Sequence, residues 1–176
     1  FNSPFGACPV CSGLGSQMKL DMELVLPDKS LSLAGGAVAP LSSNTKSYSM
    51  CQMKAVLEKH GYNLDTPWQD LPAKVQDLLL YGTGEVRYDF GYENMFGIYK
   101  IHNGPFEGIM PMLERRYKES DSDMMREEYE NYMSISLCPE CHGARLKPEV
   151  LAVTIGGRNI QQVTDMTVRD CREFFQ

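Results

Sequence analysis

Two short cysteine motifs are the residues in this sequence best suited to chemistry. Cys8-Pro-Val-Cys11 and Cys138-Pro-Glu-Cys141 share the spacing CxxC, and each has a glycine two residues after its second cysteine. In such a knuckle, backbone N–H groups can point at the thiolates, and glycine lets the chain turn back tightly. Two knuckles supply four thiolates, the soft tetrahedral ligand set that Zn²⁺ favours. The sequence therefore predicts one zinc ion bound by Cys8, Cys11, Cys138 and Cys141.

Other uses of these cysteines are weaker but stay open. A thioredoxin-type CxxC opens a helix, and the Ser-Gly-Leu-Gly that follows Cys11 is a poor helix start. A disulfide framework is typical of shorter secreted chains. The two knuckles are separated by 126 residues, so each could instead pair with cysteines outside this sequence. The two remaining cysteines, Cys51 and Cys171, are expected to be ordinary buried thiols.

Basic residues gather at two places that could contact phosphate groups. Guanidinium and ammonium groups beside an aromatic ring suit contacts to a nucleic-acid backbone. The competing interpretation for the first place is ion pairing along one helix with Glu114 and Glu119. The first place comprises Arg115, Arg116 and Lys118, and the second comprises Arg145 and Lys147.

The composition is that of a globular domain. The chain has 176 residues, 43% of them hydrophobic, and a net charge of −6. These values exclude disorder, collagen and a membrane protein, and the negative charge argues against strong stand-alone binding to nucleic acid. The sequence holds no GxxxxGK[ST] phosphate loop and no motif for Ser-His-Asp catalysis, so we expect no catalytic residue here. Both ends are expected to be cuts through a longer protein.

Hydrophobic periodicity and turn residues place the elements that must position these groups. We expect strands at 18–26, 85–91, 96–102, 149–155 and 158–163. We expect helices at 47–60, 72–81, 106–119 and 122–134, and a last helix that starts at Thr167. Residues 1–16 and 31–45 are expected to be loops.

These elements predict an α+β fold. If one zinc ion binds both knuckles, it joins the two ends of a long insertion. The expected organisation is a small zinc-knuckle base with short antiparallel strands, formed by residues 1–33 and 135–176, and an inserted, mainly helical lobe, residues 34–134, that contains a β-hairpin.

Five segments, in order along nearly the whole chain, resemble the UvrA family of excinuclease ABC proteins. They are Phe1 to Gly15 around the first knuckle, Leu31-Ser-Leu-Ala-Gly-Gly-Ala37, Pro105-Phe-Glu-Gly108, Glu114-Arg-Arg-Tyr-Lys-Glu119, and Cys138-Pro-Glu-Cys-His-Gly-Ala-Arg-Leu146. The resemblance implies a piece of the damage-sensing ATPase of bacterial nucleotide excision repair, a dimeric protein with two ABC-type halves and zinc modules. The chain is similar to its insertion domain with the flanking zinc knuckle, inside the signature region of the first half.

The resemblance also implies partners and a role. The parent protein would bind ATP, form a homodimer, act with UvrB on damaged double-stranded DNA, and work in the bacterial cytoplasm as part of the SOS response. This chain matches none of the family's nucleotide-binding motifs, so it is expected to be non-catalytic. It would contribute DNA contacts through the basic residues and would help to shape the complex. Two alternatives remain: a protein-interaction module, because the knuckles also resemble those of DnaJ-type chaperones, and a thiol oxidoreductase.

Overall fold

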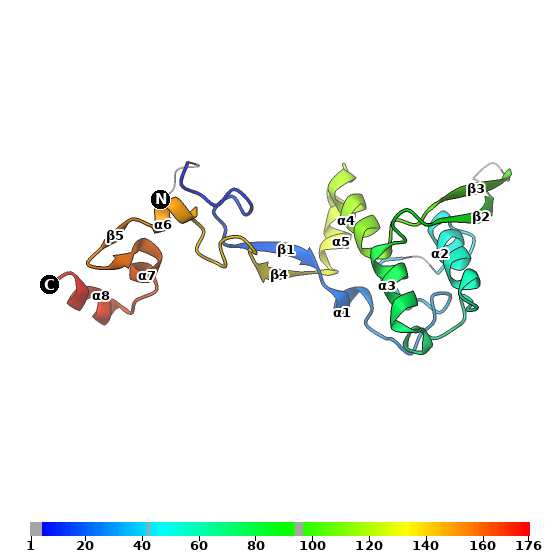
Figure 1. Cartoon of the computed structure of the whole chain (residues 1–176), viewed down its shortest axis with the longest axis horizontal. Helices are drawn as coiled ribbons and strands as arrows, with labels where there is room; N and C mark the ends of the chain where they lie inside the picture. The colour runs from blue at the N-terminus through cyan, green and yellow to red at the C-terminus, as the bar shows by residue number, and fades with distance from the viewer. Residues whose placement is uncertain (1–4, 42, 94–96) are drawn as a thin grey trace. The chain divides into compact units, whose positions relative to one another are not determined.

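The computed structural model describes residues 5–41, 43–93 and 97–176. The chain divides into two compact units, which Figure 1 shows with their elements labelled. We call Phe1–Lys19 with Ile135–Gln176 the knuckle unit, and Leu20–Ser134 the helical unit. The predictions for residues 1–4, Ser42, Asn94 and Phe96 lie outside the described residues.

Two predicted helices form the centre of the helical unit. Helix α2, Tyr48–Lys59, begins where the Ser47 side chain accepts the N–H of Met50, and it ends just before Gly61. Helix α3, Ala73–Tyr81, follows Pro72 and ends at Gly82. Both helices are therefore confirmed, because their end signals are local and strong. They bury one continuous hydrophobic core whose fully enclosed side chains include Met50, Met53, Val56, Leu57, Trp68 and Leu79.

Helix α4, Ile109–Glu119, carries the first basic cluster and lies against α3. Pro111 is its third residue, where the missing N–H removes no helical hydrogen bond, so the helix continues without a break. Ile109 and Leu113 face the core and are fully buried. Arg115 and Lys118 consequently lie on the exposed side of α4, whereas Arg116, seven residues after Ile109, is partly buried and lies beside Ser49 of α2.

The predicted hairpin is present, with each strand shifted two or three residues toward the C-terminus. Strands β2, Arg87–Glu93, and β3, Tyr99–Pro105, pair antiparallel with Phe90 opposite His102. Residues 92 and 93, just beyond the strand expected at 85–91, belong to β2, whereas residues 85 and 86 precede it. Tyr48 of α2 packs against the hairpin: its ring lies edge-on to that of Phe90, with the two ring centroids 5.2 Å apart.

Two predicted elements in this unit end earlier than periodicity indicated. The strand expected at 18–26 stops at Leu20, because the Asp21 side chain accepts the N–H of Glu23 and starts the short helix α1, Met22–Val25. The helix expected at 122–134 is α5, Asp123–Glu130. Strand β4, Met133–Leu137, follows, so the prediction that the helix extends to residue 134 was wrong.

The knuckle unit contains a two-stranded ribbon and several short elements. Strand β1, Ser16–Leu20, pairs with β4. The strand expected at 149–155 begins instead as helix α6, Pro148–Leu151, with Pro148 at its first position. Only β5, Thr154–Ile155, remains of it, and it lies antiparallel to β6, Arg158–Asn159. The strand expected at 158–163 was wrong beyond Asn159, whose side chain caps helix α7, Ile160–Thr164. The last helix, α8, Val168–Phe174, follows its cap Thr167 as predicted.

The fold class is confirmed: helices and short strands form an α+β structure with four clustered cysteines. The compact units divide at residue 19/20, whereas the sequence placed 20–33 in the base. Val25, Leu26 and Leu33 belong to the core of the helical unit, which explains the difference. None of the helices in the described part of the chain is long and apolar enough to cross a membrane.

Candidate functional site

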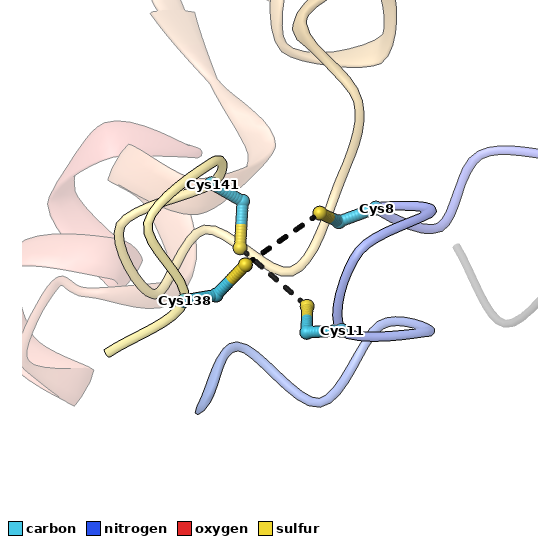
Figure 2. Close-up of side chains that lie close together, drawn as sticks. All are labelled: Cys8, Cys11, Cys138 and Cys141. Atoms are coloured by element: carbon cyan, nitrogen blue, oxygen red, sulfur yellow. Dashed lines mark hydrogen bonds between the residues drawn. The ribbon is translucent and has the colours of Figure 1, made fainter. Parts of the chain in front are cut away.

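The four cysteines of the two knuckles meet in the knuckle unit. Their sulfur atoms all lie within 4.8 Å of one another. Figure 2 shows the four side chains converging from two loops, with Sγ of Cys8 3.9 Å from Sγ of Cys138 and Sγ of Cys11 3.6 Å from Sγ of Cys141. All four are free thiols, and all but the partly exposed Cys141 are buried. The structure thus brings together the complete predicted ligand set from within the chain.

The same turn forms both knuckles. In the first, the N–H of Leu14 donates to the carbonyl of Cys11 at 2.9 Å, and in the second the N–H of Ala144 donates to that of Cys141 at 2.8 Å. The residues after each second cysteine adopt left-handed backbone conformations, with φ of 84° at Gly13. Glycine takes this conformation at little cost, which is why the motif places it there.

Backbone hydrogen bonds join the two knuckles directly. The N–H of Cys8 donates to the carbonyl of Arg145, and the N–H of Cys138 donates to that of Gly15. Gly15 has φ of 80°, and a Cβ there would lie 2.9 Å from the side chain of Arg145. The close approach of the two loops therefore needs a glycine at this position.

Burial and hydrogen bonding give two of the thiols, those of Cys11 and Cys141, different pKa values. Burial raises the pKa of the Cys11 thiol, but hydrogen bonds from the Gly15 N–H and from neighbouring groups outweigh burial and lower it to about 6. At Cys141, burial outweighs the backbone donors and raises the pKa to about 11. Because a metal binds only the thiolate, binding at neutral pH would displace a proton from Cys141.

The geometry fits a tetrahedral metal ion. Four sulfurs at about 2.3 Å from a central ion would be about 3.8 Å apart, which matches the separations of the two pairs. N–H groups pointing at sulfur, as from Gly15 to Cys11, would balance the negative charge of four thiolates. The site can thus hold a divalent ion in a closed shell, which is the arrangement of a structural site.

The first basic cluster is occupied by ion pairs and a hydrogen bond. Arg115 pairs with Glu107 and with Glu119, each at 2.9 Å. Lys118 lies 3.8 Å from Glu114, and Arg116 donates to the hydroxyl of Ser49 at 2.9 Å. The ion pairs expected along the helix are therefore present. A DNA role for Arg115, Arg116 and Lys118 stays a prediction.

The second basic pair flanks the metal site. Arg145 is exposed with φ of 66°, and its side chain lies over Gly15. Lys147 precedes α6, and its N–H donates to the carbonyl of Gly6. Backbone hydrogen bonds to the first loop, from the Cys8 N–H to Arg145 and from Lys147 to Gly6, thus fix the backbone of both residues beside the four cysteines.

Charge differs between the two units. The knuckle unit carries six Lys and Arg against five Asp and Glu, whereas the helical unit carries eleven against eighteen. The negative charge of the chain therefore belongs to the helical unit. The unit that contains the four cysteines has a small positive excess, although four thiolates around a divalent ion would add further negative charge.

Two residues that matter to the site gave no sequence signal. Gln17 lies on β1, and its amide nitrogen is 3.2 Å from the carbonyl of Val10 and 4.0 Å from Sγ of Cys138. Glu107 lies outside α4, so helical spacing could not reveal its ion pair with Arg115. Both interactions depend on how the chain folds back, which periodicity does not report.

Comparisons with known proteins show which family the chain is similar to. A family model described as the UvrA DNA-binding domain matches residues 21–131. UvrABC system protein A of Clostridium perfringens is 47% identical over 99% of this chain and 19% of its own length, and that of Bacillus subtilis is 46% identical over 100% and 18%. The crystal structure of UvrA2 from Deinococcus radiodurans matches with a TM-score of 0.69 and 26% identity, over 98% of this chain and 22% of its own. The chain thus spans about a fifth of the length of these relatives.

Proposed function

The chain belongs to the UvrA DNA-binding domain family, and on that premise we propose that it is a non-catalytic, DNA-contacting module of a bacterial nucleotide excision repair protein. The observation that carries the proposal is a family match over residues 21–131 together with relatives that align along essentially the whole chain. The DnaJ-type interaction module is not favoured, because those relatives are UvrABC proteins.

Zinc is the metal that we assign to the four cysteines. Four thiolates without a fourth-position water form a closed site, so the ion would hold the fold together and would perform no reaction. The residues that would bind it are Cys8, Cys11, Cys138 and Cys141. Its role is to fasten the first knuckle to the second, and thereby to set the positions of the backbone at Arg145 and Lys147.

DNA contacts are assigned to the two basic places. Arg145 and Lys147 lie on the rigid knuckle, whereas Arg115, Arg116 and Lys118 lie on α4. Because the helical unit is strongly acidic, these contacts would be electrostatic, independent of base sequence, and dependent on low salt or on the intact protein.

The remaining assignments concern the intact protein. It would bind ATP outside this chain, form a homodimer, act with UvrB on damaged double-stranded DNA, and work in the bacterial cytoplasm within the SOS response. In that assembly this module would position DNA beside the lesion and would help to shape the complex. ATP hydrolysis would not involve any residue described above.

A titration of duplex DNA in the intact protein tests the DNA role. We expect neutral substitutions at Arg145 and Lys147, or at Arg116 and Lys118, to weaken the binding of damaged and undamaged duplexes to the same extent. Removal of each phosphate-binding cation should make the log–log salt slope shallower by about 0.9. Parent-like affinity and slope for both pairs of variants, with zinc content unchanged, would remove the DNA role of these residues.

A further inference from the structure

The metal-binding cysteines differ in what donates hydrogen bonds to them. Cys11 accepts from the backbone N–H of Gly15 at 3.2 Å, and backbone N–H groups also approach Cys141. At Cys138 a side chain approaches instead: Nε2 of Gln17 lies 4.0 Å from its sulfur. Backbone donors are built into the knuckle turn and do not depend on side-chain type. The contact from Gln17, by contrast, depends on the type of side chain, and this residue lies in a strand outside both knuckles.

Gln17 also reaches the opposite knuckle. The same Nε2 donates to the carbonyl of Val10, between Cys8 and Cys11, at 3.2 Å. A carbonyl oxygen and a thiolate both only accept, so the amide must turn its NH₂ end toward them. The two hydrogens of one NH₂ group then serve one acceptor in each knuckle.

The backbone of Gln17 is held in place independently. Gln17 lies within β1, which pairs with β4, and its carbonyl accepts the hydroxyl of Ser136 at 3.4 Å. Ser136 is two residues before Cys138, so the strand that leads into the second knuckle also fixes the residue that reaches its sulfur. The side chain thus comes from a hydrogen-bonded strand and not from a loop.

We propose that Gln17 is a positioning residue for the metal centre, which links the first knuckle to the second by donating one hydrogen to Val10 O and one to the Cys138 thiolate. The inference rests on the metal site proposed above. Four thiolates around a divalent ion carry two net negative charges, and a donor from outside the ligand set lowers the charge density on Cys138. It also limits rotation of that side chain. Outer donors of this kind typically contribute 10- to 100-fold to metal affinity.

Zinc affinity of the 176-residue chain, measured by competition with a chromophoric chelator, tests this role. Gln17→Leu removes both donors at similar size and should weaken zinc binding roughly 10- to 100-fold while one ion per chain still binds. Gln17→Glu is close in shape but turns a carboxylate toward two acceptors, and it should weaken binding further. Gln69→Leu makes the same chemical change on the exposed surface of the helical unit and should leave the affinity unchanged.

A spectroscopic readout separates hydrogen bonding from simple packing. With Co²⁺ in place of zinc, loss of a donor raises the energy of the sulfur lone pairs. The sulfur-to-cobalt charge-transfer band should therefore move to lower energy in Gln17→Leu and not in Gln69→Leu. Suppose that the parent binds one zinc, but that Gln17→Leu has a zinc affinity within twofold of the parent's and an unshifted band. This result would overturn the role of Gln17 and leave the metal site standing. A parent that binds no metal would instead overturn the metal site itself.

Discussion

Arg115 and Glu107 form a bidentate ion pair, in which Nε lies 2.9 Å from Oε1 and Nη2 lies 3.0 Å from Oε2. A third nitrogen of the same guanidinium donates to Glu119 at 2.9 Å. These hydrogen bonds, with that to Glu107 the largest contribution, raise the pKa of Arg115 above its usual value. A phosphate group would have to displace carboxylates before it could bind this side chain.

Removing Glu107 should therefore release Arg115 for DNA. We expect Glu107→Gln in the intact protein to raise the affinity for duplex DNA and to steepen the log–log salt slope by up to about 0.9, the value of one added phosphate contact. Glu128→Gln on α5 makes the same change of charge at an exposed position and supplies the control. Equal effects of the two variants would show that only net charge matters and that Arg115 does not reach DNA.

A second prediction concerns two glycines where α3 ends and α4 begins. Gly82 and Gly108 have φ of 96° and 99°, and a Cβ on Gly108 would lie 2.5 Å from the nitrogen of Gly82. Gly108 has ψ of 151°, a combination that essentially only glycine adopts, so Gly108→Ala adds a clash with backbone to a conformational cost of about 1–3 kcal/mol. Urea unfolding should show a loss well above that figure.

Gly61→Ala is the matched control for that variant. Gly61 has φ of 83°, but a Cβ there would meet no atom within 4 Å. It should show only the cost of the backbone conformation, about 1–2 kcal/mol. If the two variants lose the same stability, the close approach of α3 and α4 does not contribute.

A third prediction links helix packing to pH. The hydroxyl of Tyr117 on α4 donates to the carboxylate of Glu130 at 3.0 Å, and this bond, with burial, raises the pKa of Tyr117 above 10.0. A raised pKa in the folded state means that this stabilisation is complete below pH 10.0 and is lost as the pH rises through the folded value. Urea midpoints between pH 8 and 11 should therefore fall less in Tyr117→Phe than in the parent. Tyr81→Phe, at an exposed tyrosine, should behave like the parent.

A fourth prediction concerns removal of the metal. Coordination by four thiolates contributes on the order of 10 kcal/mol where the site forms together with the fold. The helical unit has its own core, so it should survive chelation. Hydrogen exchange after chelation should increase mainly in 5–16 and 135–147. Equal loss of protection across 47–134 would mean that the two units depend on one metal site.

The sequence predicted what depends on local signals. The knuckles, the start of α2 at Ser47 and the end of α3 at Gly82 each follow from a few neighbouring residues, and all are present. The four cysteines could also be predicted as a set, because the CxxC motif with its following glycine is specific. The resemblance to the UvrA family was confirmed by the family match over residues 21–131 and by relatives that align along essentially the whole chain.

What could not be predicted depends on distant interactions. Asp21 interrupts an alternating apolar pattern by capping α1, and its own N–H donates to the carbonyl of Tyr132, more than a hundred residues away. Met133 fits a helical stripe, yet pairing of β4 with β1 draws it into a strand. Gln17 fell between the predicted loop at 1–16 and the predicted strand at 18–26, and its partners in the two knuckles gave no local signal.

Zinc X-ray absorption on the purified 176-residue chain is the most direct test of a zinc ion bound by Cys8, Cys11, Cys138 and Cys141, because it counts the ligand atoms around the ion. We predict one zinc per chain with four sulfur neighbours at about 2.3 Å. Cys138→Ser should reduce the sulfur count to three or release the metal. Two sulfur atoms together with nitrogen or oxygen around the zinc of the unsubstituted chain would contradict the four-cysteine site. A chain that folds without zinc would also contradict it.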